Sequence, residues 1–212
     1  MVLPHGFRTV VIRGDEFKFC CAHFVSYAGF RERLHGHNYT VEVEATGDMS
    51  VDDGYVIDFG ILKKSIREIC KSLNEKVLVP TKSKTMKISF VERRVTAQEP
   101  PPLKGIVTCG VNDTADDCCG GRDDCGTYNS PQVYDDNQQV EIECQSSFFS
   151  FPRNDCALID VSFSTAEELS KYFAERLQET LGSEFATRGI QSITVRVFER
   201  PTQAASFTYR FD

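Results

Sequence analysis

Three histidines lie close together in this chain, at His23, His35 and His37, and their type and spacing suit metal chemistry. His35 and His37 alternate at the start of the strand-like run HNYTVEVEA, so their side chains are expected on one face of the strand. His23 ends a second strand-like run, EFKFCCAH, which we expect to pair beside the first. Three converging imidazoles would bind a tetrahedral zinc ion and leave its fourth position open, as in a catalytic site.

A His-x-His pair alone is weak evidence for a metal, because alternating strand residues often include two histidines by chance. The third histidine changes this interpretation, since the chain has four histidines in all and three of them fall in one window. The fourth, His5, lies outside that window in the N-terminal segment, and we interpret it as an ordinary residue.

The composition is that of an acidic, soluble enzyme of one domain. The formal net charge is −7 over 212 residues and no basic stripe is present, which argues against a nucleic-acid partner. No apolar run is long enough to span a membrane, and the N-terminus lacks the features of a signal peptide. The nine cysteines are therefore expected to be reduced thiols in a cytoplasmic protein.

The chemistry-bearing residues must be positioned by strands and helices, which the periodicity predicts. Alternating or extended runs predict strands over 7–13, 16–24, 37–47, 191–199 and 205–211. Gly14-Asp15 predicts a hairpin turn between the first two. Apolar residues at helical spacing predict one helix over 59–74, capped by Asp58, and a second from the capping box at Ser164 to Gly182. Without residues 77–158 the order is strand-strand-helix followed by helix-strand-strand, which predicts the fold class α+β, a four-stranded antiparallel sheet with two helices on one face.

Residues 77–158 separate the two halves of this pattern, and we interpret them as an insertion into a single domain spanning 1–212. Runs over 85–94 and 139–152 predict the two strands of an extra hairpin. Between them, 97–137 is rich in Pro, Gly, Asp and Asn and predicts a flexible loop. The loop's four cysteines lack paired C-x-x-C spacing, so exposed thiols are favoured over a second zinc site. They are Cys109, Cys118, Cys119 and Cys125.

The window AHF…LHGHNYTVEVEATG and the following DDGYVIDFGILKK resemble the 6-pyruvoyltetrahydropterin synthase family, which includes the 6-carboxytetrahydropterin synthases. The match covers nearly all of 7–76 and 159–210. It implies the tunnelling (T) fold, in which trimers join their sheets and two trimers stack into a homohexamer. It also implies a lyase acting on a pterin, 7,8-dihydroneopterin triphosphate, with zinc held by the three histidines and acting on the side-chain hydroxyls as a Lewis acid.

The resemblance also implies a pterin-binding carboxylate at Glu199, in VRVFERPTQ. A carboxylate can accept two hydrogen bonds from the adjacent N–H and amino groups of the ring, which fixes its orientation. Glu199 ends an otherwise apolar strand face, although a solvated residue just past the strand is the alternative. Ser164 and Thr165 match a Ser/Thr pair that lines the family's pterin pocket, and they can cap the helix at the same time.

One departure from the family concerns its catalytic cysteine, which precedes the HGH in pyruvoyl- and carboxy-forming members. The segment GFRERLHGH has no cysteine but carries Glu32 three residues before His35. This E-x-x-H-G-H form resembles a subgroup, known from malaria parasites, that shortens the substrate side chain and releases 6-hydroxymethyl-7,8-dihydropterin. The resemblance implies that Glu32 takes a proton from the substrate. The alternative is an exposed loop glutamate beside Arg31 and Arg33.

A second departure concerns an Asp-His pair that serves the family as a proton relay after the first helix. Asn74 and Glu75 stand at these positions, and asparagine cannot titrate, while the unperturbed pKa of a glutamate is about 4.3. Either Glu75 takes over or the relay is lost. The leading hypothesis is side-chain cleavage, and the alternatives are triphosphate elimination to 6-pyruvoyltetrahydropterin, a catalytically impaired pterin-binding homologue, or a structural metal protein.

Overall fold

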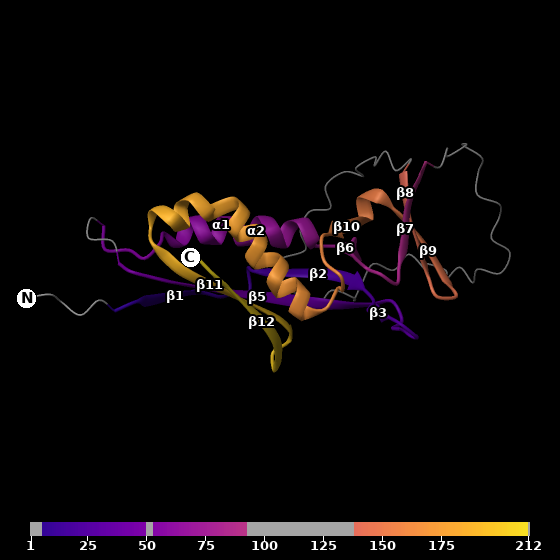
Figure 1. The fold of residues 1–212 in the computed structure, drawn as a ribbon, viewed down its shortest axis with the longest axis horizontal. Coiled ribbons are helices and arrows are strands. Elements are labelled where there is room, and N and C mark those ends of the chain that lie inside the picture. The colour runs from indigo at the N-terminus through magenta and orange to yellow at the C-terminus, as the bar shows by residue number, and fades with distance from the viewer. Residues whose placement is uncertain (1–5, 50–52, 93–137, 212) are drawn as a thin grey trace, which may run out of the picture.

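One long strand, β5 (His35–Gly47), forms the centre of the main sheet in the computed structural model, which describes residues 6–49, 53–92 and 138–211. The sheet has seven strands in the order β10-β6-β2-β5-β11-β12, with β1 also paired to β5. Two helices, α1 (Phe59–Leu73) and α2 (Ala166–Thr187), cover one face of it (Figure 1). The remaining strands of the sheet are β1 (Arg8–Ile12), β2 (Lys18–His23), β6 (Lys76–Pro80), β10 (Cys156–Ile159), β11 (Ile190–Arg200) and β12 (Gln203–Arg210).

The two N-terminal strands lie end to end along one edge of β5 rather than beside each other. β1 pairs antiparallel with the C-terminal part of β5 and β2 with its N-terminal part, while β11 occupies the other edge. The predicted hairpin around Gly14-Asp15 is therefore wrong. The 13 residues of β5 are long enough to pair with both short strands in turn, and the connection turns back with the Phe17 N–H donating to the Gly14 carbonyl at 3.1 Å.

The main sheet has seven strands rather than the predicted four, and two of them, the short parallel strands β6 and β10, were not predicted. β6 pairs parallel with β2, and β10 pairs parallel with β6. β6 and β10 lie at the two ends of the predicted insertion 77–158, so the ends of this segment belong to the main sheet. Strands of this kind are buried on both faces and read as continuous apolar runs rather than as an alternation, which hides KVLVP and CALI from a period-two search. The α+β class with two helices on one face is confirmed.

Helix α1 agrees with its prediction, and helix α2 differs at both ends. Asp58 caps α1, where its side chain accepts from the Gly60 N–H at 2.6 Å. In α2 the N-cap is Thr165 rather than Ser164. The helix continues beyond the predicted end at Gly182 because Phe185 extends the buried stripe by one more turn.

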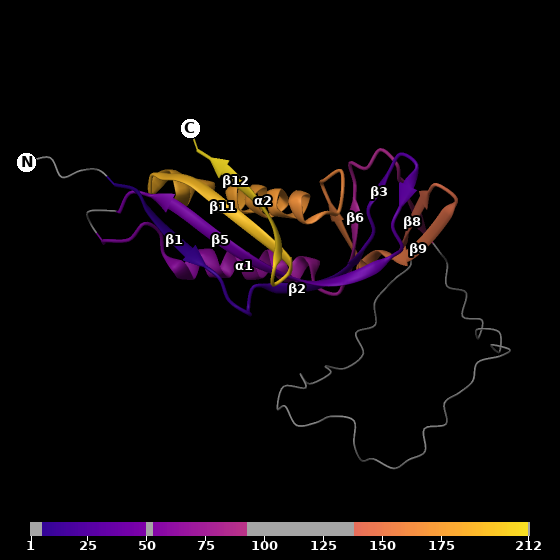
Figure 2. The ribbon, with the colours of Figure 1, turned by 90° about the horizontal axis from the view of Figure 1, so that it is seen from below.

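The inserted sheet is a separate three-stranded antiparallel unit beyond one end of the main sheet (Figures 1 and 2). Residues 139–152, predicted as one strand, are two strands, because Gln145 adopts a positive φ of 54° in a tight turn. Residues 97–137, with their predicted loop and four cysteines, lie outside the described residues. The strands of the inserted sheet are β7 (Lys87–Glu92), β8 (Gln138–Cys144) and β9 (Ser147–Pro152).

A very short hairpin lies between the two sheets. Its strands are β3 (Ser26–Tyr27) and β4 (Phe30–Arg31), and Figure 2 shows it beside β8. It connects β2 to β5 and so carries the chain from His23 to His35. No helix in the described part of the chain is long and apolar enough to cross a membrane.

The core lies between the main sheet and its helices, and it extends toward the histidines. Along β5 the residues Tyr39, Val41 and Val43 are fully buried under the helices, whereas the residues between them are partly exposed on the other face. His37 and His35 continue this inward-facing series toward the start of the strand. The alternation of one strand therefore places a hydrophobic core at one end and polar side chains at the other.

Candidate active site and metal centre

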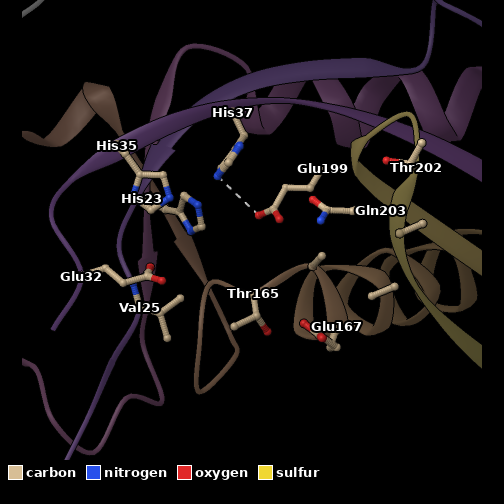
Figure 3. Close-up of a pocket in the computed structure, with 13 residues that line it drawn as sticks. His23, Val25, Glu32, His35, His37, Thr165, Glu167, Glu199, Thr202 and Gln203 are labelled. Atoms are coloured by element: carbon tan, nitrogen blue, oxygen red, sulfur yellow. Dashed lines mark hydrogen bonds and ion pairs between the residues drawn. The ribbon is translucent and has the colours of Figure 1, made fainter. Parts of the chain in front are cut away.

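The three histidines converge at the start of β5. His23 and His35 are direct partners in the β2–β5 register, and His37 is opposite Cys21. The centroids of the three rings are 4.6 to 5.3 Å apart, and one nitrogen from each lies within 4.8 Å of the others. His23 is buried and His35 is open to solvent (Figure 3). The convergence expected from the alternation is confirmed, and the group could hold a metal ion.

Hydrogen bonds orient two of the imidazoles for this role. The Ser164 hydroxyl donates its hydrogen to the Phe24 carbonyl at 3.0 Å, so its oxygen can accept from Nδ1 of His23 at 3.3 Å. The Nε2 lone pair of His23 is then on the pocket side of the ring, where it lies 3.3 Å from the Tyr39 hydroxyl. His35 makes the equivalent contact from Nδ1 to the Arg33 carbonyl at 2.8 Å. Such outer contacts fix the tautomer and direction of metal-binding histidines.

The electrostatics of the centre also suit a cation. Burial, followed by the proximity of His35 and His37, lowers the pKa of His23 below its ordinary value. The neutral imidazole is the form that binds a metal. A tetrahedral zinc ion accepts nitrogen ligands and keeps a position for substrate when three side chains hold it. The residues present therefore fit zinc.

Glu199 lies across from the histidines at the end of β11. Its Oε1 is 3.4 Å from Nε2 of His37 and accepts from the Tyr39 hydroxyl at 3.1 Å. The carboxylate continues the buried face formed by Val195 and Val197, as the sequence predicts. Burial and the carboxylate of Glu199 raise the pKa of Tyr39 far above its ordinary value, so the phenol keeps the proton that it donates.

Glu32 lies in the pocket wall on the other side of the histidines (Figure 3). Its Oε2 accepts from the Val25 N–H at 3.0 Å, and its own N–H donates to the Val25 carbonyl at 2.9 Å. The residue is half-buried rather than an exposed loop glutamate. Arg31 contacts the backbone carbonyl of Glu32, not its carboxylate. Because the backbone holds one carboxylate oxygen, the side chain has a defined direction into the pocket.

The pocket that contains these groups has a volume of about 640 Å³. Its far wall is formed by the start of α2 and by the turn between β11 and β12. Glu167, Thr202 and Gln203 belong to this wall and were missed by sequence reasoning. Thr202 and Gln203 could have been predicted from their position in the sequence. They lie at the turn that closely follows Glu199, and a turn next to a ligand-binding strand residue stays close to the same ligand.

The remaining predicted residues have different positions. Thr165 lines the pocket and caps α2, accepting from the Glu168 N–H at 3.4 Å. Ser164 is buried behind His23 and does not line the pocket. Glu75 is exposed after α1, with a positive φ of 59° and its N–H donating to the Cys20 carbonyl at 2.6 Å. This chain does not bring Glu75 to its own pocket.

Comparison with known proteins identifies the family. The model of the 6-pyruvoyl tetrahydropterin synthase family matches residues 14–210. The chain belongs to this family. A protein of Pyrococcus horikoshii assigned as a 6-carboxy-5,6,7,8-tetrahydropterin synthase is 25% identical over 197 residues, which are 92% of this chain and 88% of that protein. The Bacillus subtilis 6-carboxy-5,6,7,8-tetrahydropterin synthase is 43% identical over 65 residues, 30% of this chain and 42% of that one.

Solved structures of the family share the whole fold. The Plasmodium falciparum 6-pyruvoyl tetrahydropterin synthase superposes with a TM-score of 0.72 at 29% identity, covering 97% of this chain and 99% of that one. The Plasmodium vivax enzyme gives 0.71 at 30% identity with the same coverage. The expected T-fold is therefore confirmed, and this member of the 6-pyruvoyl tetrahydropterin synthase family is an enzyme of pterin biosynthesis.

Proposed function

We propose that this protein is a zinc-dependent lyase that binds 7,8-dihydroneopterin triphosphate and cleaves its side chain to release 6-hydroxymethyl-7,8-dihydropterin. The observation that carries the proposal is the position of Glu32. Its carboxylate shares one pocket with the three histidines, which are close to it in sequence, and with Glu199, which is far from it in sequence. A proton acceptor, a metal centre and a pterin anchor are the three parts that this reaction requires.

Each part has a defined role in the proposal. His23, His35 and His37 would hold zinc, which when bound lowers the pKa of a side-chain hydroxyl of the substrate. Glu199 accepts two hydrogen bonds from the pterin ring, and Tyr39 keeps its carboxylate oriented through the 3.1 Å hydrogen bond. Glu32, with Oε2 held by the Val25 N–H, takes the proton from the hydroxyl on the second side-chain carbon. That oxygen becomes a carbonyl as the bond between the first and second side-chain carbons breaks, a two-carbon aldehyde carrying the triphosphate leaves, and the remaining carbon takes up a proton to give the hydroxymethyl group.

Glutamate, rather than cysteine, is the group that can take this proton. None of the described residues lining the pocket is a cysteine. Burial raises the pKa of the nearby Cys21 thiol to about 12, so this thiol is protonated near neutral pH. In the family, two of the solved Plasmodium vivax structures carry a catalytic glutamate replaced by alanine or by cysteine, which supports the role of Glu32.

A second candidate, a pterin-binding homologue with impaired catalysis, is favoured by the contacts after α1. The side chain of Asn74 accepts from the Cys20 N–H at 2.9 Å, and Glu75 is exposed outside the pocket. In this case the pterin binds through Glu199 without turnover. A product of triphosphate elimination, 6-pyruvoyltetrahydropterin, would indicate the third possibility.

The family resemblance further leads us to propose a cytoplasmic homohexamer of two trimers. Light scattering can test the hexamer through the mass of the assembly.

Replacement of Glu32 tests the proposal. We expect Glu32→Gln to lower kcat by at least about a hundredfold, because the amide cannot take a proton. The control is Glu68→Gln, which changes the same functional group at an exposed position on α1. Zinc content and pterin affinity should be unchanged in both variants. Full turnover in Glu32→Gln would contradict the proposal, and binding without turnover in the unmodified protein would favour the second candidate.

A further inference from the structure

The hairpin that carries the chain into Glu32 is too short to hold its own conformation. β3 and β4 have two residues each, and Gly29 between them adopts a positive φ of 81°. Isolated hairpins, even longer ones, are at best marginally stable in water. The direction of Glu32 therefore depends on what packs against this hairpin.

One contact with the inserted sheet passes through Ser26, which is 1% exposed. Thr85, just before β7, donates from its hydroxyl to the Ser26 carbonyl at 3.0 Å. Cys144, at the end of β8, donates from its thiol to the Ser26 hydroxyl at 3.0 Å. Ser26 in turn donates to the Phe30 carbonyl at 3.2 Å. Ser26 thus connects β3 to the inserted sheet directly, and through its bond to Phe30 it also connects β4, two residues before Glu32.

A second contact passes through Arg31. Its guanidinium lies over the ring of Phe149 in β9 at 5.4 Å and over the ring of Phe24 at 5.8 Å. These two rings stack on each other with centroids 5.0 Å apart. The same guanidinium donates to the backbone carbonyl of Glu32 at 2.7 Å. The attraction between the guanidinium and the aromatic faces fixes the position of the Arg31 side chain. Because the same guanidinium bonds to the backbone of Glu32, it also fixes the position of that residue.

We propose that the inserted sheet positions Glu32, with Arg31 and Ser26 as the positioning residues that connect the two. This inference rests on the proposed role of Glu32. The histidines and Glu199 are held by strand pairing in β2, β5 and β11 of the main sheet, and the contacted segment reaches the histidines only through the backbone carbonyls of Phe24 and Arg33. Loss of the contacts should leave metal and pterin binding intact and release the Glu32 carboxylate from the Val25 N–H. The consequence is lower kcat at nearly constant KM, because displacement of a catalytic group by about 1 Å can cost up to about a hundredfold in rate.

A pair of matched arginine variants tests the inference. Arg31→Met keeps the length of the side chain and removes the guanidinium. Arg67→Met is the control, because Arg67 lies over the ring of Phe17 at 5.6 Å on α1, away from the pocket. With 7,8-dihydroneopterin triphosphate, we expect Arg31→Met to lower kcat on the order of tenfold with KM within about twofold, and Arg67→Met to change neither.

Hydrogen exchange measured on peptides spanning 24–33 gives a readout that does not require turnover. The Val25 N–H should exchange faster in Arg31→Met and remain protected in Arg67→Met, since its acceptor is the Glu32 carboxylate. Phe149→Leu, which removes the aromatic face while retaining an apolar side chain, should give the same result and serves if Arg31→Met does not fold.

A double variant separates positioning from general destabilisation. In a Glu32→Gln background, Arg31→Met should cause no further loss of the residual turnover, because its effect passes through Glu32. Equal losses in both backgrounds, or unchanged kcat and exchange in Arg31→Met, would overturn the inference. If the unmodified protein has no turnover, the proposed function fails, but the exchange comparison still decides whether the inserted sheet holds this segment. Faster exchange in Arg31→Met and not in Arg67→Met supports the inference, and unchanged exchange in Arg31→Met overturns it.

Discussion

Replacement of Glu199 by glutamine should weaken pterin binding by a predictable amount. The substitution keeps the shape of the side chain but replaces one of its acceptor oxygens by a donor nitrogen and removes the charge. Each hydrogen bond to a charged group is worth about 1.5–3 kcal/mol. The side chain retains 32% exposure, so we take the lower end of that range for the bond that is lost, and a similar amount for the unpaired amide donor that then faces a donor of the ring. The expected loss is about 3 kcal/mol, which is on the order of a hundredfold in Kd.

Isothermal titration of the zinc-loaded protein with biopterin measures this loss. The matched control is Glu42→Gln, because Glu42 is a strand glutamate of β5 that pairs with Arg196 at 2.6 Å on the opposite face of the sheet. We expect the control to bind biopterin as the unmodified protein does. A Glu199→Gln variant with unchanged Kd and normal zinc content would refute the assignment of Glu199 as the anchor.

Three further outcomes follow from the geometry. Tyr39→Phe removes the 3.1 Å hydrogen bond to Glu199 and should raise the Kd of biopterin on the order of tenfold, with titration calorimetry as the measurement and an unchanged Kd as the contradicting result. Removal of zinc by a chelator should abolish turnover but leave the circular dichroism spectrum unchanged, because the core of the main sheet and helices does not include the histidines; unfolding on chelation would instead indicate a structural metal. Phe173→Ala should lower the free energy of unfolding by about 3–5 kcal/mol in urea titrations, since Phe173 is fully buried between α2 and the sheet, and a change below about 1 kcal/mol would contradict this packing.

The centre of the site could be predicted from the sequence because it depends on local alternation. His35 and His37 share a strand face by the period of two, and one pairing rule brings His23 beside them. The family resemblance pointed to Glu199, and the same period of two in β11 predicted that its side chain continues the apolar face of that strand. Zinc itself stays a prediction, as do the catalytic and binding roles of these residues.

Other features depend on contacts that no local pattern encodes. Ser164 has the sequence signature of a helix cap, yet its hydroxyl orients His23, because the chain before α2 passes behind the three histidines. β6 and β10 become strands through parallel pairing between segments that are far apart in sequence. Gln203 reaches the pocket because the turn between β11 and β12 folds toward α2. Tertiary packing decides these positions, so they required the structure.

The most direct test of the account is the identity of the pterin that the zinc-loaded protein releases from 7,8-dihydroneopterin triphosphate. Chromatography with mass spectrometry distinguishes a one-carbon side chain from a three-carbon one. The account predicts 6-hydroxymethyl-7,8-dihydropterin as the product, dependent on Glu32. Release of 6-pyruvoyltetrahydropterin, or recovery of unchanged substrate from protein with a full complement of zinc, would contradict it.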